Sequence, residues 1–431
     1  MIYLDNSATT KPCPEAVEAV NQALTRQWGN PSALYGFGID AAHDLRVARQ
    51  QVAAALGAEP DRVFFTSGGT EADNWALFGT VKRLGKRGKH IITTAMEHHA
   101  ILNCTKELES QGYRVTYLKP DSQGRITADQ LKAALTPDTI LVSIMMVNNE
   151  VGSVSPIREL ARLTHRICPD AVFHTDAVQG FLKIPFQAKT LGADLISVSS
   201  HKIHGPKGAG ALYISPRLKS FPALLLGGGQ EGGYRSGTEA TPAIFGFAAA
   251  CRAVAATFRE DTARERALLE ALVQKLSGLP GVRINGCHEA PHILSLSVPG
   301  VPVQNTINLL QDAHICVSAG SACAKGHRSH VLTAMNADPE LIDGAFRISL
   351  CRDTTPQELD IFLEVLQRDI LPRARRSGTN SPYRSKSVGT HFLKKRSFSA
   401  HASPFGRGGP AERRDGEGFR RAFPLSVTPM A

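Results

Sequence analysis

The segment at residues 199–208, SSHKIHGPKG, has residue types that could do covalent chemistry. It directly follows residues 194–198, a short apolar run of the kind that forms a buried strand. An ammonium group that loses its hydration tends to lose its proton, and the neutral amine is a nucleophile that forms an imine with a carbonyl. Lys202 is therefore a candidate Schiff-base lysine. On this stretch alone, a phosphate-binding or solvated lysine ahead of a Gly-Pro turn stays open.

A second segment, residues 67–72 (SGGTEA), lies between an apolar run at 63–66 and a helical pattern that extends to about Leu84. Two glycines between a strand and a helix let the backbone approach a ligand closely, and the start of the helix offers free N–H groups to an anion. The segment predicts a phosphate cradle. Ordinary helix capping by Ser or Thr is an equal alternative.

Short apolar runs alternate with helical patterns along the first half of the chain. We predict strands at residues 63–66, 90–94, 114–118, 139–147, 171–174 and 194–198. We predict helices at 14–27, 40–56, 98–111, 128–135 and 157–167, besides the one that ends near Leu84. Because the strands are almost continuously apolar, the pattern predicts an α/β fold with a mainly parallel sheet covered on both faces. Ligands of such sheets bind beyond the carboxyl ends of the strands. Polar clusters occupy those positions at residues 67–70, 97–99, 148–150, 176–179 and 199–202.

The second half of the chain has a mixed pattern. A glycine-rich loop at residues 227–238 precedes a long helix at 242–276, a helix of the kind that links two domains. Strands are predicted at 293–298, 314–318 and 345–350, and helices at 303–310 and 356–370, which together suggest a smaller α+β domain. The predicted organisation is an N-terminal arm (1–13) that packs with the small domain, a large domain (14–255), a small domain (256–376) and a basic tail (377–431).

The net charge of +10 over 431 residues does not by itself indicate a nucleic-acid-binding protein. Ten Lys and Arg against three Asp and Glu lie in the tail, at residues 377–431, and account for seven of these charges. A basic tail rich in Ser, Gly and Pro is usually disordered and solvated. We therefore expect no direct contact with nucleic acid.

The chain also lacks the sequence signs of a membrane or exported protein. No run of about eighteen uncharged apolar residues occurs, and residues 1–6 have neither a basic nor an apolar region typical of a signal peptide. The eight cysteines are scattered singly, without the paired spacing of a zinc site. Reduced thiols in the cytoplasm, with no metal site, are the expectation.

Eight motifs in order together resemble those of the NifS/IscS-type cysteine desulfurases, in the class V branch of the fold-type I aminotransferases. They are LDNSATT (4–10), TSGGTE (66–71), EH (97–98), VNNEVG (147–152), DAVQ (176–179), SSHK (199–202), RSGT (235–238) and GSAC (320–323). The match extends from Ile2 to about Arg376. It implies a fold-type I pyridoxal-phosphate-dependent transferase, with a seven-stranded sheet in the large domain, that acts as a homodimer.

The resemblance implies that the cofactor is pyridoxal 5'-phosphate (PLP). Lys202 would hold its aldehyde, Asp176 would pair with its ring nitrogen, and Gln179 would bond to its ring hydroxyl. His98 would stack on the ring and handle protons. As isolated residues, Asp176 could instead be a helix N-cap and His98 a capped surface histidine.

The other implied contacts are with the phosphate and the substrate. Gly69, Thr70, Ser199 and His201 would bind the phosphate, joined by Thr238 from a second subunit. Asn149 would contact the cofactor, and together with Arg347 it would bind the carboxylate of L-cysteine. Arg347 could equally be an edge-strand arginine in a salt bridge.

Cys323 would decide the reaction. It would attack the sulfur of the substrate, leaving a persulfide on Cys323 and releasing L-alanine. The cations Lys325, His327 and Arg328 should favour its thiolate. The persulfide would pass to an acceptor protein, an iron–sulfur scaffold or a tRNA thiolation enzyme. Of the remaining cysteines we interpret five as buried or idle, and we leave Cys316 open because it lies near Cys323; the five are Cys13, Cys104, Cys168, Cys251 and Cys351.

Two departures from the family pattern limit these expectations. The segment after Cys323 is shorter than the loop of many IscS-type members, which puts the reach of the persulfide and the choice of acceptor in doubt. The tail after about Ser377 has no counterpart. A selenocysteine lyase or another class V enzyme, in which Cys323 is dispensable, is one rival interpretation. A non-catalytic sulfur-relay or RNA-associated protein that works through its basic tail is another.

Overall fold

A computed structural model describes the chain at residues 1–319 and 328–377. Residues 320–327 and 378–431 lie outside this description, and so do the side chains of residues 375–377. The predictions made for Cys323, Lys325, His327 and the tail therefore fall outside the described residues.

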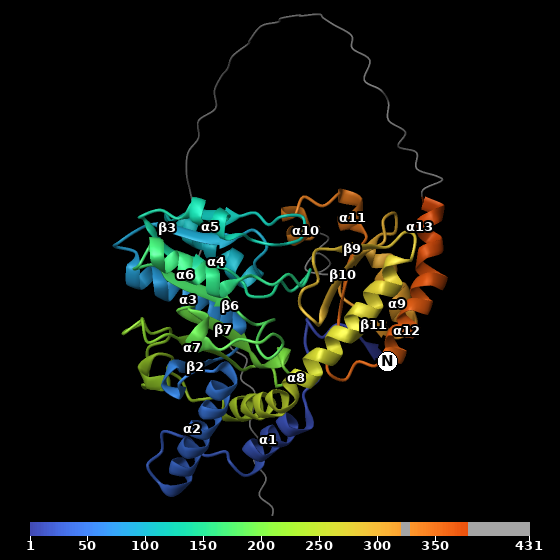
Figure 1. Ribbon diagram of the computed structural model, residues 1–431. Helices are drawn as coiled ribbons and strands as arrows, with labels where there is room; N and C mark the ends of the chain where they lie inside the picture. Colours follow the sequence, from blue (N-terminus) through green and yellow to red (C-terminus); the bar gives the residue numbers. More distant parts are fainter. Residues whose placement is uncertain (320–327, 378–431) are drawn as a thin grey trace, which may run out of the picture. The chain divides into compact units, whose positions relative to one another are not determined.

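The central element is a seven-stranded sheet (Figure 1). Its order is β2-β8-β7-β6-β5-β3-β4, and all neighbours from β7 to β4 are parallel, as predicted. The strands are β2 (Val63–Thr66), β8 (Gly210–Ile214), β7 (Leu195–Ser199), β6 (Val172–Asp176), β5 (Thr139–Ser143), β3 (His90–Thr94) and β4 (Arg114–Leu118).

Strand β8 was missing from the sequence prediction. It pairs antiparallel with both β2 and β7, returning directly from the turn that follows Lys202. An antiparallel neighbour needs only a short connection, so no α-helix separates β7 from β8, only a 3-10 turn at Ser200–Lys202. Its apolar run at 211–214 also follows the glycines Gly208 and Gly210, and we had interpreted that region as a turn.

Both faces of the sheet are covered. The central strands send side chains into two separate cores, as Ile91 and Ile92 of β3 do. One core is shared with α3 (Gly69–Leu84) and α4 (His99–Ser110). The other contains residues of α5 (Ala128–Ala134), α6 (Ile157–Ile167) and α8 (Thr241–Ser277). This double covering explains why the strands are continuously apolar.

A third core belongs to a smaller antiparallel sheet of order β12-β10-β9. Its strands are β9 (Arg283–Asn285), β10 (Ile293–Ser297) and β12 (Ala345–Ser349). The helices packed in this core are α9 (Val303–Asp312), α12 (Pro356–Val365) and the C-terminal part of α8. The N-terminal arm also contributes, because β1 (Ile2–Tyr3) pairs with β11 (Ile315–Cys316) and Leu4 is buried in the same core.

Helix α8 connects the cores. Its first half, with Ile244 and Phe247, packs beside α1 (Pro14–Thr25) and α2 (Gly36–Leu56), whereas Leu269 and Leu276 lie in the third core (Figure 1). The predicted boundary between residues 255 and 256 thus falls inside one continuous helix and stays a prediction. Among the described residues, α8 alone has the length and composition of a membrane span, but its apolar window is mostly buried, as in the core helix of a globular protein.

Candidate active site

A cavity of about 440 Å³ lies beyond the carboxyl ends of the parallel strands. Segments that follow β2, β3, β5, β6 and β7 all reach it, and β12 contributes from the smaller sheet. Nearly all of the predicted cofactor and substrate residues line this cavity. They are Gly69, Thr70, His98, Asn149, Asp176, Gln179, Ser199, His201, Lys202 and Arg347. Thr238 is the exception, since it is exposed and does not line the cavity of this chain.

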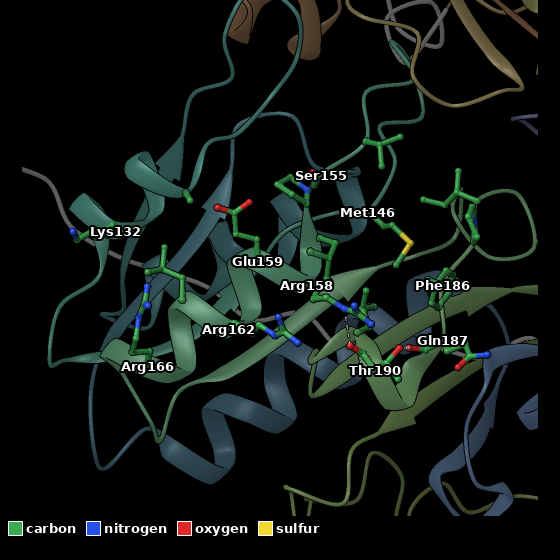
Figure 2. Close-up of a pocket in the computed structure, with 18 of the residues that line it drawn as sticks. Lys132, Met146, Ser155, Arg158, Glu159, Arg162, Arg166, Phe186, Gln187 and Thr190 are labelled. Atoms are coloured by element: carbon green, nitrogen blue, oxygen red, sulfur yellow. Dashed lines mark hydrogen bonds between the residues drawn. The ribbon is translucent and has the colours of Figure 1, made fainter.

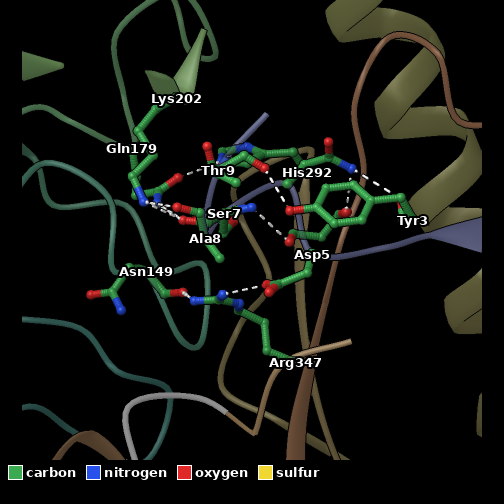
Figure 3. Close-up of polar contacts among 12 residues, drawn as sticks. Tyr3, Asp5, Ser7, Ala8, Thr9, Asn149, Gln179, Lys202, His292 and Arg347 are labelled. Atoms are coloured by element: carbon green, nitrogen blue, oxygen red, sulfur yellow. Dashed lines mark hydrogen bonds and ion pairs between the residues drawn. The ribbon is translucent and has the colours of Figure 1, made fainter. Parts of the chain in front are cut away.

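The amine of Lys202 is held by main-chain carbonyls. Its Nζ donates to Ser7 O at 2.6 Å and to Ala8 O at 2.8 Å (Figure 3). Burial, together with the positive charges of Arg347 and Lys183, lowers the pKa of Lys202 to about 7. A substantial fraction of the amine is therefore neutral near neutral pH, as a carbonyl-binding lysine requires.

The N-terminal segment at residues 5–10 is part of this site, which reasoning from the residues alone had not predicted. Ser7 O also accepts from Gln179 Nε2 at 2.9 Å (Figure 3). Thr9 Oγ1 lies 3.2 Å from His201 Nδ1. We had interpreted these residues as part of an N-terminal arm (1–13) that packs with the small domain. The signal was a run of small polar residues directly after an apolar start, but nothing local in it points to Lys202.

Asp176 stands at the end of β6 among other buried acids. Its Oδ1 accepts the N–H of Val178 at 2.8 Å, and burial raises its pKa. Asp73 is also buried, and desolvation together with the charge of Asp176 raises its pKa well above the usual range. Burial raises the pKa of Glu97 to about 8. Three carboxyl groups so placed are not all ionised, and a charged Asp176 calls for a cationic partner in the cavity.

The residues after Asp176 form turns rather than a helix, so the N-cap interpretation of this residue is wrong. The sequence analysis did not single out Asp73. Its signal was an acidic residue on the buried face of a predicted helix, four positions after Gly69.

The opposite end of the cavity suits a phosphate. Helix α3 begins at Gly69 after Gly68, and no side chain caps it. A Cβ on Gly69 would lie 2.6 Å from Cγ2 of Val178, so only glycine fits here. Burial lowers the pKa of His201 to about 4, which leaves it a neutral donor beside the hydroxyl of Ser199. Neutral donors and an uncapped helix N-terminus match a phosphate dianion.

His98 is both the N-cap of α4 and a cavity residue. Its Nδ1 accepts the N–H of Ala100 at 3.2 Å, which leaves the proton of the neutral ring on Nε2. The ring is open to solvent on one side, yet the surrounding protein desolvates it enough to lower its pKa. The predicted capped histidine and the predicted cofactor-facing histidine are thus compatible.

Arg347 lies on the edge strand β12 with its side chain in the cavity. Its Nη1 donates to Asn149 O at 2.6 Å, and its Nη2 lies 2.8 Å from Asp5 Oδ1 (Figure 3). Its Nε is buried and has no hydrogen-bond partner in the described part of the chain. The arginine is therefore in a salt bridge, as one interpretation predicted, and still has a donor for a ligand.

Comparison with known proteins shows similarity along most of the chain. Residues 2–362 match the family model described as aminotransferase class-V. The cysteine desulfurase IscS of Methanosarcina thermophila is 40% identical over 386 residues, which cover 88% of this chain and 94% of that protein. The chain belongs to the class V aminotransferase family, among the NifS/IscS-type cysteine desulfurases.

Two solved structures support the same assignment. A NifS-like protein superposes on this cysteine desulfurase with a TM-score of 0.80 at 37% identity, covering 85% of this chain and 98% of that one. SspA, in a structure described as a complex with cysteine, has a TM-score of 0.72 at 31% identity, with 82% of this chain and all of the SspA chain covered. The fold-type I architecture inferred from the motifs is confirmed.

Described residues on both sides of the segment that contains Cys323 reach the cavity. Ser318, just before it, lines the cavity, and so does His330, just after it, whose Nε2 lies 2.9 Å from Glu97 O. Arg328 pairs with Asp343 through two contacts of 2.7 Å. That pairing offsets the charge that we had expected Arg328 to contribute to the Cys323 thiolate.

The other cysteines of this desulfurase differ in burial. Burial raises the pKa of Cys104 to about 12 and that of the half-buried Cys287 to about 11, so both are protonated thiols. Cys316 is half-buried in β11. The five that we had interpreted as buried or idle are buried free thiols: Cys13, Cys104, Cys168, Cys251 and Cys351.

Proposed function

We propose that this cysteine desulfurase binds PLP in the cavity and converts L-cysteine to L-alanine and a persulfide on Cys323. One observation carries the proposal. A lysine whose pKa is about 7 shares a cavity with a buried acid, neutral anion donors and an arginine. The bound cysteine named in the SspA structure supports the choice of substrate.

Different residues of the described chain would bind different parts of the cofactor. Gly69, Thr70, Ser199 and His201 would hold the phosphate, because they combine neutral donors with a helix N-terminus. Asp176 would hold the protonated ring nitrogen, which supplies the cation that this buried carboxylate lacks. Bound PLP supplies an aldehyde and an electron sink.

Two groups are suited to move protons. Lys202 can hold or release a proton near neutral pH, which fits removal of the proton from Cα of the substrate. His98 carries its proton on Nε2, since Nδ1 is occupied by the N–H of Ala100. This arrangement lets His98 donate a proton from a fixed ring orientation.

Arg347 would bind the substrate carboxylate. Its buried Nε lacks a protein partner among the described residues, and its two other nitrogens are fixed by Asn149 O and Asp5. The guanidinium is therefore held in place before the substrate arrives. The side-chain amide of Asn149 is directed away from Arg347 (Figure 3) and would contact the cofactor or substrate from the other side.

Cys323 would accept the sulfur. Its thiolate would attack the substrate sulfur, so that an S–S bond forms while the C–S bond of the substrate breaks. The carbon would keep the electron pair of the C–S bond and, once protonated, become the methyl of L-alanine. Cys323 lies five residues after Ser318, a cavity residue, so its Cα could lie at most about 18 Å from the Cα of Ser318. The distance in sequence is thus compatible with attack in the cavity.

Substitution of Cys323 tests this function. The full-length variant Cys323→Ser should keep the visible absorption of lysine-bound PLP but lose nearly all sulfide release from L-cysteine, whereas Lys202→Ala should lose both. Cys287→Ser is the matched control, because this half-buried thiol lies outside the cavity, and it should retain full activity. Full sulfide release by Cys323→Ser would refute the persulfide route. Full release of selenide from selenocysteine by the same variant would favour the selenocysteine lyase.

We further propose a homodimer in which Thr238 of one subunit reaches the phosphate site of the other. Leu34 is 93% exposed and Leu226 is 85% exposed, which is unusual for leucine. Leu34 directly precedes α2, and α2 is joined to the loop of Leu226 and Thr238 by two contacts of 2.6 Å between Arg49 and Glu231. An apolar surface beside an exposed Thr238 fits a subunit interface.

The cellular role follows from the same chemistry. We propose that the enzyme works in the cytoplasm and passes its persulfide to an iron–sulfur scaffold or a tRNA thiolation enzyme. Free thiols in the described part of the chain suit a reducing compartment. The shared similarity to IscS supports a sulfur-supplying role.

A further inference from the structure

A groove of about 1010 Å³, separate from the cofactor cavity, lies between α5, α6 and the segment at residues 184–191 (Figure 2). It shares no lining residue with the cofactor cavity. None of the reaction steps above uses it.

One end of the groove is basic. Arg158, Arg162 and Arg166 recur every four residues on α6, so they form a row on one side of the helix, and Lys132 of α5 lies across from them (Figure 2). All four side chains are exposed. Arg158 donates to Thr190 O at 3.0 Å. Within residues 1–319 and 328–377, no hydrogen bond or ion pair engages Lys132, Arg162 or Arg166.

The other end of the groove is apolar. Met146 and Phe186 lie there, away from Lys132 and Arg166 (Figure 2). Ile184 and Leu191 also line the groove. Phe186 and Ile184 are only half-buried, so a ligand can cover apolar surface that the chain itself leaves open.

The floor of the groove touches the backbone of the active site. Met145 and Val147 line the cofactor cavity, whereas Met146 between them lines the groove. The N–H of Met146 donates to Asp176 O at 2.8 Å. The backbone of residues 145–147 therefore separates the apolar end of the groove from the cofactor cavity.

We propose that this groove docks an acidic segment of a partner protein, with carboxylates against the α6 arginines and an apolar side chain against Met146 and Phe186. The unpaired cations attract carboxylates, and an apolar side chain that covers the open apolar end would stabilise the complex. A nucleic acid fits less well, because its phosphates would not cover the apolar end of the groove. Asp129 and Glu159 on the rim oppose phosphates and carboxylates alike. The chain's own tail is basic and would be repelled by the arginine row.

A labelled peptide tests the proposal on the full-length enzyme. The probe is a fluorescein-labelled peptide with four glutamates followed by a Leu-Phe anchor, and its binding is measured by fluorescence anisotropy. We expect saturable binding that weakens with salt. The variant Arg162→Glu/Arg166→Glu should weaken the binding at least about tenfold.

The control is Lys82→Glu/Lys86→Glu, which makes the same change in net charge at two exposed lysines near the end of α3, outside the groove. Its affinity should stay close to that of the wild type. The basic tail is present in every variant, so peptide bound to the tail contributes equally to all of them. Equal weakening by both double variants would overturn the proposal.

Further measurements locate the interaction. Replacing Leu-Phe of the peptide with Ser-Ser, or Phe186 with Ala, should weaken binding about threefold to tenfold. On peptide addition, hydrogen exchange should slow across residues 157–167. Absence of peptide binding, or tighter arginine-dependent binding of a single-stranded RNA or of anionic phosphatidylserine vesicles, would contradict an acidic protein partner. All readouts are binding measurements, so the outcome is independent of desulfurase activity.

Discussion

Lys202 shows how position alone changes the chemistry of a side chain. Desolvation and two neighbouring cations act against its charge, whereas Asp5 and Asp176 act in its favour. The balance lowers its pKa to about 7, well below that of an ordinary lysine. The same shift affects stability, because the amine binds its proton less tightly in the folded protein than in the unfolded chain.

Replacing Lys202 should therefore stabilise the cofactor-free protein near neutral pH. The folded state binds fewer protons than the unfolded state between pH 7 and about 10.4, so the wild type gains stability as pH rises through this window. Lys202→Met removes the cost of burying a charged amine. We expect the free energy of unfolding to rise by on the order of 2 kcal/mol at pH 6.5. This figure allows for solvent screening and for the lost bonds to Ser7 O and Ala8 O. Urea denaturation at pH 6.5 and 9.5 measures it. A gain that does not shrink at the higher pH would contradict the lowered pKa.

Arg347 should govern substrate affinity more than turnover. A lysine at this position keeps the charge but cannot contact Asn149 O, Asp5 and a ligand in one plane. We expect Arg347→Lys to raise KM for L-cysteine about tenfold to a hundredfold with a smaller change in kcat. Steady-state sulfide release checks this. An unchanged KM would assign Arg347 to the salt bridge alone.

At the scale of elements, the start of α3 depends on the absence of a side chain. Gly69 lies against Val178, in the turn that follows Asp176. The segment that follows β2 and the segment that follows β6 both line the cavity, and they pack against each other at this contact. The phosphate end and the ring end of the site are positioned by each other.

Gly69→Ala should push these two segments apart. The new Cβ would lie 2.6 Å from Val178 Cγ2, and we expect PLP affinity to fall about tenfold or more. The double variant Gly69→Ala/Val178→Ala removes the clashing methyl and should recover most of the loss, with Val178→Ala alone as the control. Titration of PLP by absorption measures all three. Failure of the double variant to recover affinity would show that the contact is not the cause.

At the scale of the whole molecule, the described chain holds an almost complete site from which one predicted contact, Thr238, is absent. Exposed leucines beside the Thr238 loop suggest where a second copy would lie. A dimer would therefore have a chemical consequence, because the phosphate site would share residues of two subunits.

Leu34→Glu/Leu226→Glu should yield monomers and weaken PLP binding. The two charges would oppose burial of the exposed leucines, and we expect the loss of PLP affinity to match that of Thr238→Ala, about tenfold. Light scattering after gel filtration gives the mass. Ile361→Glu on α12, another exposed apolar residue, serves as the control and should leave a dimer. A wild type that is monomeric at micromolar concentration would rule out the shared site.

Much of the fold could be predicted from the sequence because its strands are short, continuously apolar and separated by helices. The predicted bounds of β2, β3, β4 and α6 are those observed, and β6 extends two residues further than predicted. Strand β8 was missed because no α-helix separates it from β7. Helix 356–370 was predicted as one element, but α12 ends at Val365 and a π-helical turn follows.

The sequence by itself determined the candidates for the chemistry, because an amine, acids, anion donors and an arginine are properties of residue type and the eight motifs resemble those of the cysteine desulfurases; the roles of these residues stay predictions. Tertiary structure alone decided that Ser7 and Ala8 hold Lys202, that Asp5 holds Arg347, and that the arginines of α6 border a groove with an open apolar end. The physical reason is that these contacts join segments up to about 340 residues apart. Hydrophobic periodicity reports the environment of a residue along its own strand or helix, but it does not report which distant segment comes to lie beside it.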